Sequence, residues 1–300
     1  MLVSINSKPS RLGAIAEALV VNLIWASTFV LVKLGLGSGS GPLTLAGLRY
    51  FSGFLLLLPF LTRNGNGLRS LPIRLWIRLC VIGLCAFTLG NGALFWGLQY
   101  IPATTGSLIL SLIPLPVLVL GVFWLKEIPT ISQMGGIAVA LSGSVLFFSP
   151  GLSAGDPLGI GIAAAGLIGF AFFGILGREV ARDRQVDTLS LTAIPLAFGG
   201  GVLLILAFVV EGLPRISGFG WLIVFWLALI NTAFAYILYN HSLQVLTALE
   251  MNMLNNLAPL LTAAMAGVFL GERLDSIQVI GMITVIIGVA LVEWRGRKPI

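Results

Sequence analysis

The sequence predicts an all-α integral membrane protein, with ten transmembrane helices arranged as two five-helix inverted repeats and with both termini in the cytoplasm. Three observations predict this fold class. The chain of 300 residues is 58% hydrophobic and only 9% charged, with a mean hydropathy of +1.05, whereas a soluble domain carries about 25% charged residues. Its apolar stretches are long enough to cross a bilayer. Finally, the pattern of residues 98–146 recurs at residues 243–291.

The transmembrane helices are expected wherever about 20 apolar residues follow one another. Short segments rich in Gly, Pro and charged residues separate these runs, and none is long enough to hold a soluble domain. The polar, basic segment 1–11 is not expected to be a cleaved signal, because the apolar run after it is long enough to span and stay. The expected spans are 13–36, 42–62, 75–98, 103–125, 131–148, 157–177, 188–210, 219–240, 247–270 and 276–294.

The positive charges of the loops predict the orientation. If the N-terminus is cytoplasmic, most Lys and Arg side chains lie on the inner side, among them Arg11 and Arg178, and few lie outside, such as Arg215 and Arg273. An excess of Lys and Arg in cytoplasmic loops is the usual bias of multi-pass membrane proteins. Both termini are therefore expected in the cytoplasm.

The internal repeat predicts two related halves. It carries the fourth span onto the ninth and the fifth onto the tenth, so that each half has five spans. Because five is odd, the halves must insert with opposite orientations, which predicts a first repeat over 1–150 and a second over 151–300. This plan is typical of transporters whose substrate site lies between the halves near the bilayer midplane. The identical pairs include Gln99/Gln244, Pro114/Pro259, Glu127/Glu272, Gln133/Gln278, Gly136/Gly281 and Gly143/Gly288.

Several short stretches resemble a known family. They are WASTFVLVK from Trp25, PLTLAGLRY from Pro42, LQYIPA from Leu98, and the proline–leucine pairs at Pro114 and Pro259. Together they resemble the drug/metabolite transporter superfamily in its EamA branch, and within that branch the bacterial exporters of aromatic and other amino acids. The resemblance covers nearly the whole chain. One departure is a lysine before the glutamate of the first repeat, where a small residue is usual.

The resemblance implies a secondary transporter of the inner membrane that exports small amphipathic metabolites by alternating access between the repeats. Amino acids, including aromatic ones, are the leading substrates, and other metabolites or drugs of the superfamily are the alternative. We expect a monomer in a lipid bilayer with a small-molecule substrate, and no cofactor, metal or nucleic acid. A passive channel is less favoured, because no filter-like segment is present. An intramembrane hydrolase is less favoured too, because the only histidine has no nucleophile and acid arranged with it.

The first two spans supply candidates for the wall of the substrate cavity. Asn22, Trp25 and Phe29 share one helical face with Lys33, and an amide, two rings and an ammonium suit a zwitterion with an aromatic side chain. Lys33 has a second interpretation, because it could reach the outer interface instead. Arg49 lies well inside span two, where a charge is costly, so it points either into a wet cavity or outward to water.

Spans four and nine each carry a proline at the equivalent point. Because Pro114 and Pro259 cannot donate a backbone hydrogen bond, each helix is expected to bend there. Polar backbone at that depth survives only inside protein or along a cavity, so we expect two hinges that border the substrate site. Helix–helix hydrogen bonding is the alternative role for the polar side chains that precede the prolines, namely Ser107, Ser111, Asn252 and Asn256.

Spans three, six and eight add aromatic candidates. Tyr100 and Tyr239 are expected in the aromatic belts at the membrane interfaces. The only histidine could titrate near neutral pH. The residues expected to line the cavity are Trp96, Phe170, Phe173, Tyr236 and His241.

Four glutamates are given structural roles. Glu127 and Glu272 recur at turns, and we expect each to accept backbone N–H groups at the start of the next helix. Glu17 and Glu250 lie inside spans toward the cytoplasmic side. We expect each to pair with a basic loop residue, with proton coupling as the alternative.

Overall fold

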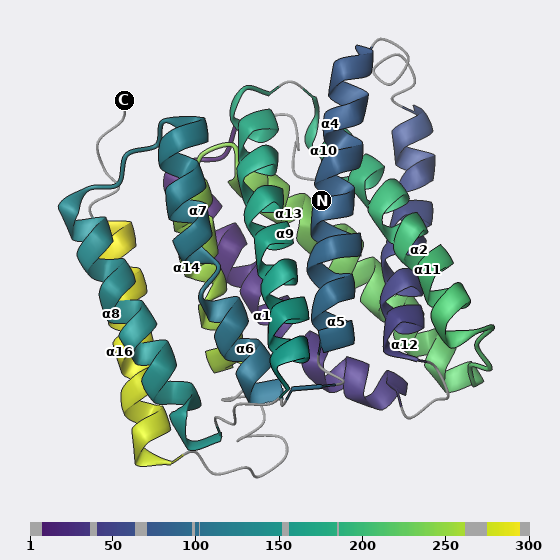
Figure 1. Ribbon diagram of the computed structural model, residues 1–300. Helices are drawn as coiled ribbons and strands as arrows, with labels where there is room; N and C mark the ends of the chain where they lie inside the picture. Colours follow the sequence, from purple (N-terminus) through teal and green to yellow (C-terminus); the bar gives the residue numbers. More distant parts are fainter. Residues whose placement is uncertain are drawn as a thin grey trace.

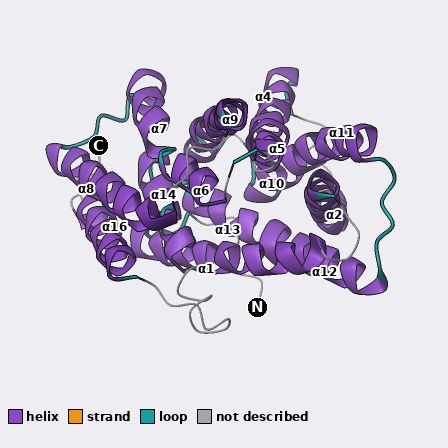
Figure 2. Ribbon diagram, turned by 60° about the horizontal axis from the view of Figure 1, so that its bottom comes forward, coloured by secondary structure: helices purple, strands orange, loops and turns teal. Residues whose placement is uncertain are grey.

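The chain forms a bundle of helices, seen from two directions in Figures 1 and 2, in a computed structural model. The structure describes residues 8–36, 41–63, 71–97, 100–101, 103–151, 156–184, 186–261 and 275–294. Within these ranges every regular element is a helix, as the composition predicts. The elements are α1 (Arg11–Leu36), α2 (Pro42–Arg63), α4 (Ile73–Gly83), η1 (Leu84–Gly92), α5 (Ala93–Gly97), α6 (Ala103–Ser111), α7 (Pro114–Leu120), η2 (Gly121–Leu125), α8 (Ile131–Phe148), η3 (Ser149–Gly151), α9 (Pro157–Arg182), α10 (Thr188–Pro195), η4 (Leu196–Gly200), α11 (Gly201–Glu211), α12 (Gly218–Ala228), η5 (Leu229–Phe234), α13 (Ala235–Ser242), α14 (Ala248–Asn255) and α16 (Ser276–Trp294).

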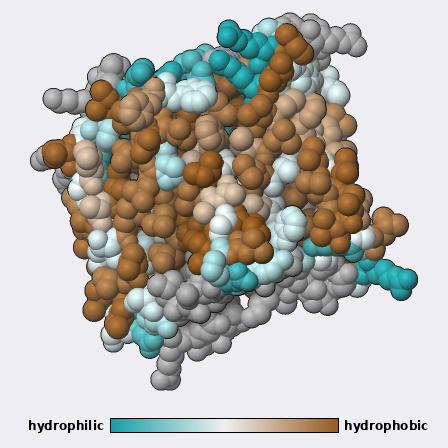
Figure 3. All heavy atoms as spheres, in the orientation of Figure 1, coloured by the Kyte–Doolittle hydropathy of each residue, from teal (hydrophilic) through white to brown (hydrophobic). Residues whose placement is uncertain are grey.

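The helices are long and apolar enough to cross a membrane. Nine such spans lie within the described residues, and each matches a predicted span. The remaining predicted span, 247–270, begins with α14 and is described only as far as residue 261, so ten helices and cytoplasmic termini stay predictions. Large apolar side chains face outward on many of these helices. Figure 3 shows them covering most of one face, with hydrophilic residues gathered toward its upper and lower edges, as expected for a protein surrounded by lipid.

Hydrogen bonds from polar side chains begin several of the helices. Thr130 and Gln133 form a reciprocal capping box at the start of α8, and at the start of α16 Gln278 accepts from the backbone N–H of Asp275 at 3.0 Å. The repeated glutamines therefore serve as helix caps. At the start of α2, the carboxylate of Glu211 accepts from the backbone N–H of Thr44 at 2.8 Å, so that a residue of α11 caps a helix far from it in sequence.

Within the described residues, wide π-helical turns interrupt the third, seventh and eighth spans, as η1, η4 and η5, and end the fourth span, as η2. The turn η1 starts at Leu84 and the turn η5 at Leu229, which are equivalent positions of the repeat. Such turns rotate the residues after them relative to a regular α-helix, and they are frequent at functional sites. The third and eighth spans therefore share a distortion that a regular helical projection of the sequence does not include.

The two predicted halves pack against each other in a reciprocal pattern. Helix α8 packs along α16 and α2 along α11, while α1 packs on α13 and its repeat counterpart α9 packs on η1 and α5. Both ribbon views show α8 beside α16 at one edge of the bundle. If the two halves are exchanged, the α8–α16 and α2–α11 contacts map onto themselves, and the α1–α13 contact maps onto the contact of α9 with η1 and α5. The packing therefore has the pattern of an internal two-fold relation.

Glycines at repeat-related positions allow α8 and α16 to approach closely. A Cβ atom placed on Gly136 would lie 2.8 Å from the carbonyl oxygen of Gly288, and one on Gly143 would lie 2.6 Å from the backbone nitrogen of Val285. Conversely, a Cβ atom placed on Gly288 would collide with the backbone nitrogen of Ala140. Small residues are the usual means by which membrane helices come together.

We therefore expect Gly136→Ala to destabilise the protein, because the new methyl group collides with the backbone of α16. The neighbouring Gly135 offers a matched control, since a Cβ atom there meets no atom within 4 Å. In detergent, the Gly136→Ala protein should lose its monodisperse elution at a lower temperature than the wild type, while Gly135→Ala should behave like the wild type. Equal behaviour of the two variants would contradict close α8–α16 packing.

Candidate functional site

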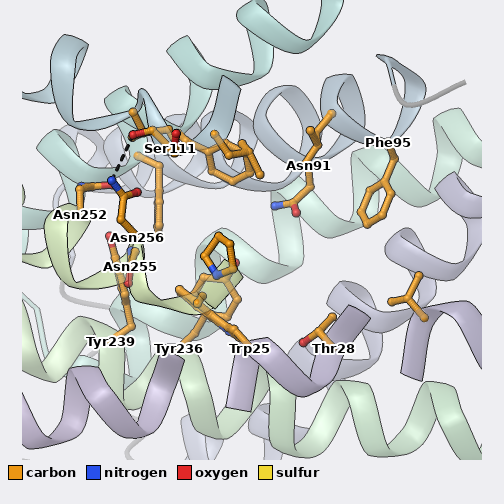
Figure 4. Close-up of a pocket in the computed structure, with 18 of the residues that line it drawn as sticks. Trp25, Thr28, Asn91, Phe95, Ser111, Tyr236, Tyr239, Asn252, Asn255 and Asn256 are labelled. Atoms are coloured by element: carbon orange, nitrogen blue, oxygen red, sulfur yellow. Dashed lines mark hydrogen bonds between the residues drawn. The ribbon is translucent and has the colours of Figure 1, made fainter. Parts of the chain in front are cut away.

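A cavity of about 240 Å³ lies between the two predicted halves (Figure 4). Its wall is contributed by helices from both halves and combines aromatic rings, amides and one guanidinium. The lining residues in the described part of the chain are Trp25, Thr28, Val32, Arg49, Tyr50, Asn91, Leu94, Phe95, Leu110, Ser111, Ile113, Phe170, Phe173, Tyr236, Tyr239, Asn252, Asn255, Asn256, Ala258 and Pro259.

The repeat is visible in the cavity wall. The side-chain amide of Asn256 donates to the backbone carbonyl of Ser111 at 3.1 Å, and these two residues are 145 positions apart, which is the offset of the repeat. A direct contact between equivalent residues places them close to the axis that relates the halves. Six further lining pairs have the same separation, namely Trp25/Phe170, Thr28/Phe173, Asn91/Tyr236, Leu94/Tyr239, Leu110/Asn255 and Ile113/Ala258. The cavity therefore lies on this axis.

Aromatic rings form the middle of the cavity wall. The ring of Trp25 lies 5.3 Å from that of Tyr236 and 5.6 Å from that of Tyr239. Phe173 stacks on Tyr239 with the two ring centroids 5.3 Å apart and the planes at 15°. The indole N–H of Trp25 donates to the backbone carbonyl of Asn231 at 3.2 Å. These rings offer flat apolar surfaces for stacking and for cation–π contact.

Arg49 is a buried cation in this wall. Its side chain is 5% exposed, and it donates from Nε to the hydroxyl of Thr232 at 2.8 Å and from Nη2 to the carbonyl of Asn231 at 3.0 Å. Among the residues that the structure describes, no carboxylate contacts this guanidinium. Taking a charge out of water without an opposite charge is costly. The arrangement therefore favours an anionic ligand group beside Arg49.

The π-helical turn η5 positions this guanidinium. Asn231 lies in η5, and its carbonyl oxygen accepts from both Trp25 and Arg49. Its side-chain amide donates to the carbonyl of Ile24 at 2.7 Å and to the hydroxyl of Thr28 at 3.0 Å. Asn231, which lies in the turn before α13, thus connects α1, α2 and the eighth span at the cavity.

Amide groups form another part of the wall. Asn252 and Asn256 each donate from Nδ2 to a backbone carbonyl, of Ala248 at 2.8 Å and of Ser111 at 3.1 Å. Asn91 accepts from the hydroxyl of Tyr50 at 2.8 Å. The side-chain oxygen of Asn255 is buried without a hydrogen-bond partner among the described residues.

The helix interruptions predicted before the two prolines are present. Helix α6 ends at Ser111 and α7 begins at Pro114, while α14 ends at Asn255 ahead of Pro259. Only Pro259 borders the cavity. Pro114 is buried at the start of α7. The polar residues Ser111, Asn255 and Asn256 lie at or beside these interruptions, which explains how their backbone and side chains reach the cavity wall.

Most of the predicted binding residues line the cavity, but three lie elsewhere. Asn22 is buried and donates to the carbonyl of Ala18 at 2.8 Å. Trp96 is 45% exposed because the residue beside it, Phe95, takes the inward position, and helical neighbours point about 100° apart. The predicted residues that do line it are Trp25, Arg49, Ser111, Phe170, Phe173, Tyr236, Asn252, Asn256 and Pro259.

The third exception is His241, which lies outside the cavity. Its Nδ1 atom is 2.9 Å from both carboxylate oxygens of Glu17, and the hydroxyl of Ser242 donates to the same carboxylate at 3.1 Å. Glu17 was expected to pair with a basic loop residue, but it contacts the imidazole of His241, which lies in a membrane-spanning helix. The side chains of Phe29 and Ser107, like Glu272, lie outside the described part of the chain.

The sequence interpretation missed several lining residues, among them Tyr50, Asn91, Phe95 and Asn255. The repeat would have found one of these, because Asn91 is equivalent to Tyr236, whereas Asn255 could have been found from its position next to Asn256. Tyr239 was expected in an interface belt, and this prediction was wrong, since its side chain is 1% exposed and lies in the cavity wall. Tyr100, at 40% exposed, is placed as a belt residue would be.

A buried ion pair ties the halves together at the end where α1 begins and α9 ends. The sequence predicts that this end faces the cytoplasm, and we call it the inner end. Glu127 accepts from Nε of Arg178 at 2.9 Å and from the backbone N–H of Ala248 at 3.4 Å. Arg178 also donates to the carbonyl of Leu243 at 2.6 Å. The expectation that Glu127 caps the next helix is therefore corrected, because Gln133 caps α8 and the carboxylate bonds residues of the other half.

Further ion pairs at the inner end also cross between the halves. Arg11 of α1 contacts Glu250 at 2.8 Å and Glu293 at 3.2 Å, which fulfils the expectation that Glu250 pairs with a basic residue near the interface. Arg78 of α4 contacts Glu179 of α9 at 3.2 Å. The inner end is thus closed by several polar contacts that would have to break if the halves separated there.

These membrane-spanning helices, with a cavity between the two predicted halves, have the architecture of a multi-pass membrane transporter. The chain belongs to the EamA-like transporter family, whose model matches residues 12–149 and again residues 157–294. It is accordingly a multi-pass transporter of the inner membrane, in a family of transporters and not of enzymes.

Individual relatives are similar over most of the chain. The uncharacterized inner membrane transporter YedA of Escherichia coli strain K12 is 28% identical, over 90% of this chain and 87% of its own length. A probable terminal-alkyne amino-acid exporter of Streptantibioticus cattleyicolor is 28% identical, over 96% of this chain and 97% of its own. A crystal structure of a protein at 18% identity superposes with a TM-score of 0.79, covering 94% of this chain and 96% of that chain, which supports the fold.

Proposed function

We propose that the protein is a secondary exporter of amino acids, including aromatic ones. The observation that carries the proposal is the buried guanidinium of Arg49. It lines the cavity and contacts no carboxylate among the residues that the structure describes. A substrate carboxylate would compensate this charge through charge-assisted hydrogen bonds. The similarity to a probable terminal-alkyne amino-acid exporter supports the same substrate class.

The remaining wall suits the rest of an amino acid. The rings of Trp25, Tyr236 and Tyr239 surround the middle of the cavity and can receive both an apolar side chain and, by cation–π contact, an ammonium group. Neither Asp nor Glu occurs among the lining residues in the described ranges. This electrostatic environment favours a substrate with an anionic group over a purely cationic drug.

We further propose that export proceeds by alternating access between two inverted repeats, 1–150 and 151–300. The reciprocal packing and the position of the cavity between the halves support this mechanism. The interruptions before Pro114 and Pro259 would act as hinges, and the contacts of the inner end would break whenever the cavity opens there. Movement of this kind is the usual way in which such halves expose a fixed site to each side in turn.

The test is counterflow in proteoliposomes that contain the purified full-length protein. Labelled phenylalanine should accumulate against trans phenylalanine, which distinguishes a carrier from a pore. Hydrocinnamate, which keeps the carboxylate but lacks the ammonium, should compete better than phenethylamine, which keeps only the ammonium. Preferential competition by phenethylamine would contradict the role of Arg49 and would favour cationic drugs as substrates.

Within this function, Trp25→Ala should weaken the transport of aromatic substrates. The loss of an indole that packs against the substrate ring is expected to raise the half-saturating concentration of phenylalanine roughly three- to tenfold. Alanine transport should change less, because alanine has no ring to stack. Trp226→Ala is the matched control, since Trp226 is 52% exposed on the outer surface of α12. An unchanged phenylalanine affinity in Trp25→Ala would remove Trp25 from the site.

A further inference from the structure

The cavity has two polar regions that lie apart. One surrounds Arg49, whose partners Asn231 and Thr232 lie in η5, beside Thr28 of α1. The other is built by asparagines of α14 and the residue after it. Both ribbon views place α2, which carries Arg49, and α14 on opposite sides of α13. In the close-up, the asparagines lie at one side of the cavity, Asn91 and Thr28 lie at the other, and Trp25 and Tyr236 lie between them.

The asparagine region, which consists of Asn252, Asn255 and Asn256, offers acceptor oxygens to a ligand. The amide nitrogens of Asn252 and Asn256 each use one of their two N–H groups on a backbone carbonyl, and their side-chain oxygens remain available to accept from a ligand. The hydroxyl of Ser111 likewise donates its proton to the carbonyl of Leu108 at 2.7 Å and keeps its lone pairs. A ligand group that engages these acceptor oxygens therefore has to supply a hydrogen-bond donor.

Asn255 provides the strongest indication of an unfilled site. Its side-chain oxygen is buried without a partner, and no hydrogen bond engages its amide nitrogen among the described residues. An amide in an apolar environment without any hydrogen bond is costly. In the first half the equivalent residue is Leu110, so the fold itself does not require an amide at this position. Asn255 thus has room for a polar partner that the residues described in the structure do not supply.

We propose that the asparagine region recognises a hydrogen-bond donor at the far end of an aromatic amino-acid side chain, namely a phenol O–H or an indole N–H. This inference rests on the proposed function, because it takes the substrate carboxylate to bind at Arg49. The α-carboxylate and α-ammonium groups of an amino acid are adjacent, so they occupy one polar region together. The side chain then runs between Trp25, Tyr236 and Tyr239 toward the asparagines. Tyrosine and tryptophan are therefore better substrates than phenylalanine.

The first test needs no variant. In phenylalanine counterflow with the wild-type protein, unlabelled tyrosine should compete at a concentration roughly three- to tenfold lower than unlabelled phenylalanine, the range expected for one additional hydrogen bond. O-methyltyrosine, which keeps the ring and the oxygen but lacks the O–H donor, should lose this advantage, and 1-methyltryptophan should compete less well than tryptophan. Equal competition by tyrosine, O-methyltyrosine and phenylalanine would overturn the inference.

The second test uses Asn255→Leu, which restores the residue type of the first half. This variant should bring the competition by tyrosine to the level of phenylalanine. The measured quantity is the ratio of the two half-inhibiting concentrations within one preparation, which a general change in transport rate does not alter. A retained preference for tyrosine in this variant would overturn the inference but leave the proposed function intact. Absence of counterflow with all three aromatic amino acids in the wild type would refute the proposed function and this inference with it.

Discussion

Replacing Arg49 with Gln should raise the half-saturating concentration of phenylalanine roughly ten- to hundredfold. Hydrogen bonds to a charged group contribute about 1.5–3 kcal/mol, and each 1.4 kcal/mol is a factor of ten in affinity. Glutamine still donates a hydrogen bond to Thr232 or to the carbonyl of Asn231 but carries no charge for the substrate carboxylate. The measurement is the concentration dependence of phenylalanine counterflow in proteoliposomes.

Two controls make this prediction specific. Arg49→Lys keeps the charge but loses the forked donor geometry, so it should recover part of the lost affinity. Arg74→Gln removes an exposed arginine near the start of α4 and should have little effect, because Arg74 does not line the cavity. An affinity for phenylalanine that is unchanged in Arg49→Gln, in a protein that elutes as the wild type does, would show that the carboxylate binds elsewhere.

The replacement of Arg178 with Met is expected to have the largest effect on stability. Arg178 and Glu127 are largely buried, with side chains 8% and 16% exposed, and the methionine leaves the carboxylate without its cation. Breaking a buried pair from one side typically costs about 3–5 kcal/mol. The variant also loses the hydrogen bond to the carbonyl of Leu243. We therefore expect a clearly lower thermal midpoint, measured by size exclusion of detergent-solubilised protein after heating.

The partner and a neighbouring arginine provide the controls for this prediction. The double variant Glu127→Gln with Arg178→Met should be more stable than Arg178→Met alone, because it no longer buries an unpaired charge. Arg182→Met, one turn further along α9, removes an arginine that is 38% exposed and paired with Asp183, and should stay close to the wild type. If Arg178→Met and Arg182→Met were equally stable, the cross-half ion pair would have no special role.

Much of the architecture could be predicted from the sequence, because a membrane places strong requirements on composition and length. Apolar runs of sufficient length predicted each of the spans that the structure describes. The duplicated segment predicted equivalent helix interruptions at Pro114 and Pro259 and marked Ser111 and Asn256 as equivalent. The prediction did not extend to their direct contact, which depends on where the axis between the halves passes.

The sequence could not predict which of two neighbouring side chains faces the cavity. Phe95 lines it and Trp96 does not, and Tyr239 lines it although it was expected at the interface. Both stretches follow π-helical turns, η1 and η5, which change the rotation of the residues after them. A projection that assumes a regular α-helix therefore assigns the wrong facing direction to side chains that follow each such turn.

Composition and repetition by themselves determined that this chain spans a membrane, that it is duplicated, and that its polar residues gather beside two prolines. Local patterns suffice for these properties, because bilayer thickness and helix geometry act on consecutive residues. Only the tertiary structure decided the partners of the charged groups: the carbonyl of Asn231 for Arg49, Arg178 for Glu127, and Glu17 for His241. Such partners are distant in sequence, and buried charges are stabilised by whichever groups the packing of helices brings within hydrogen-bond distance.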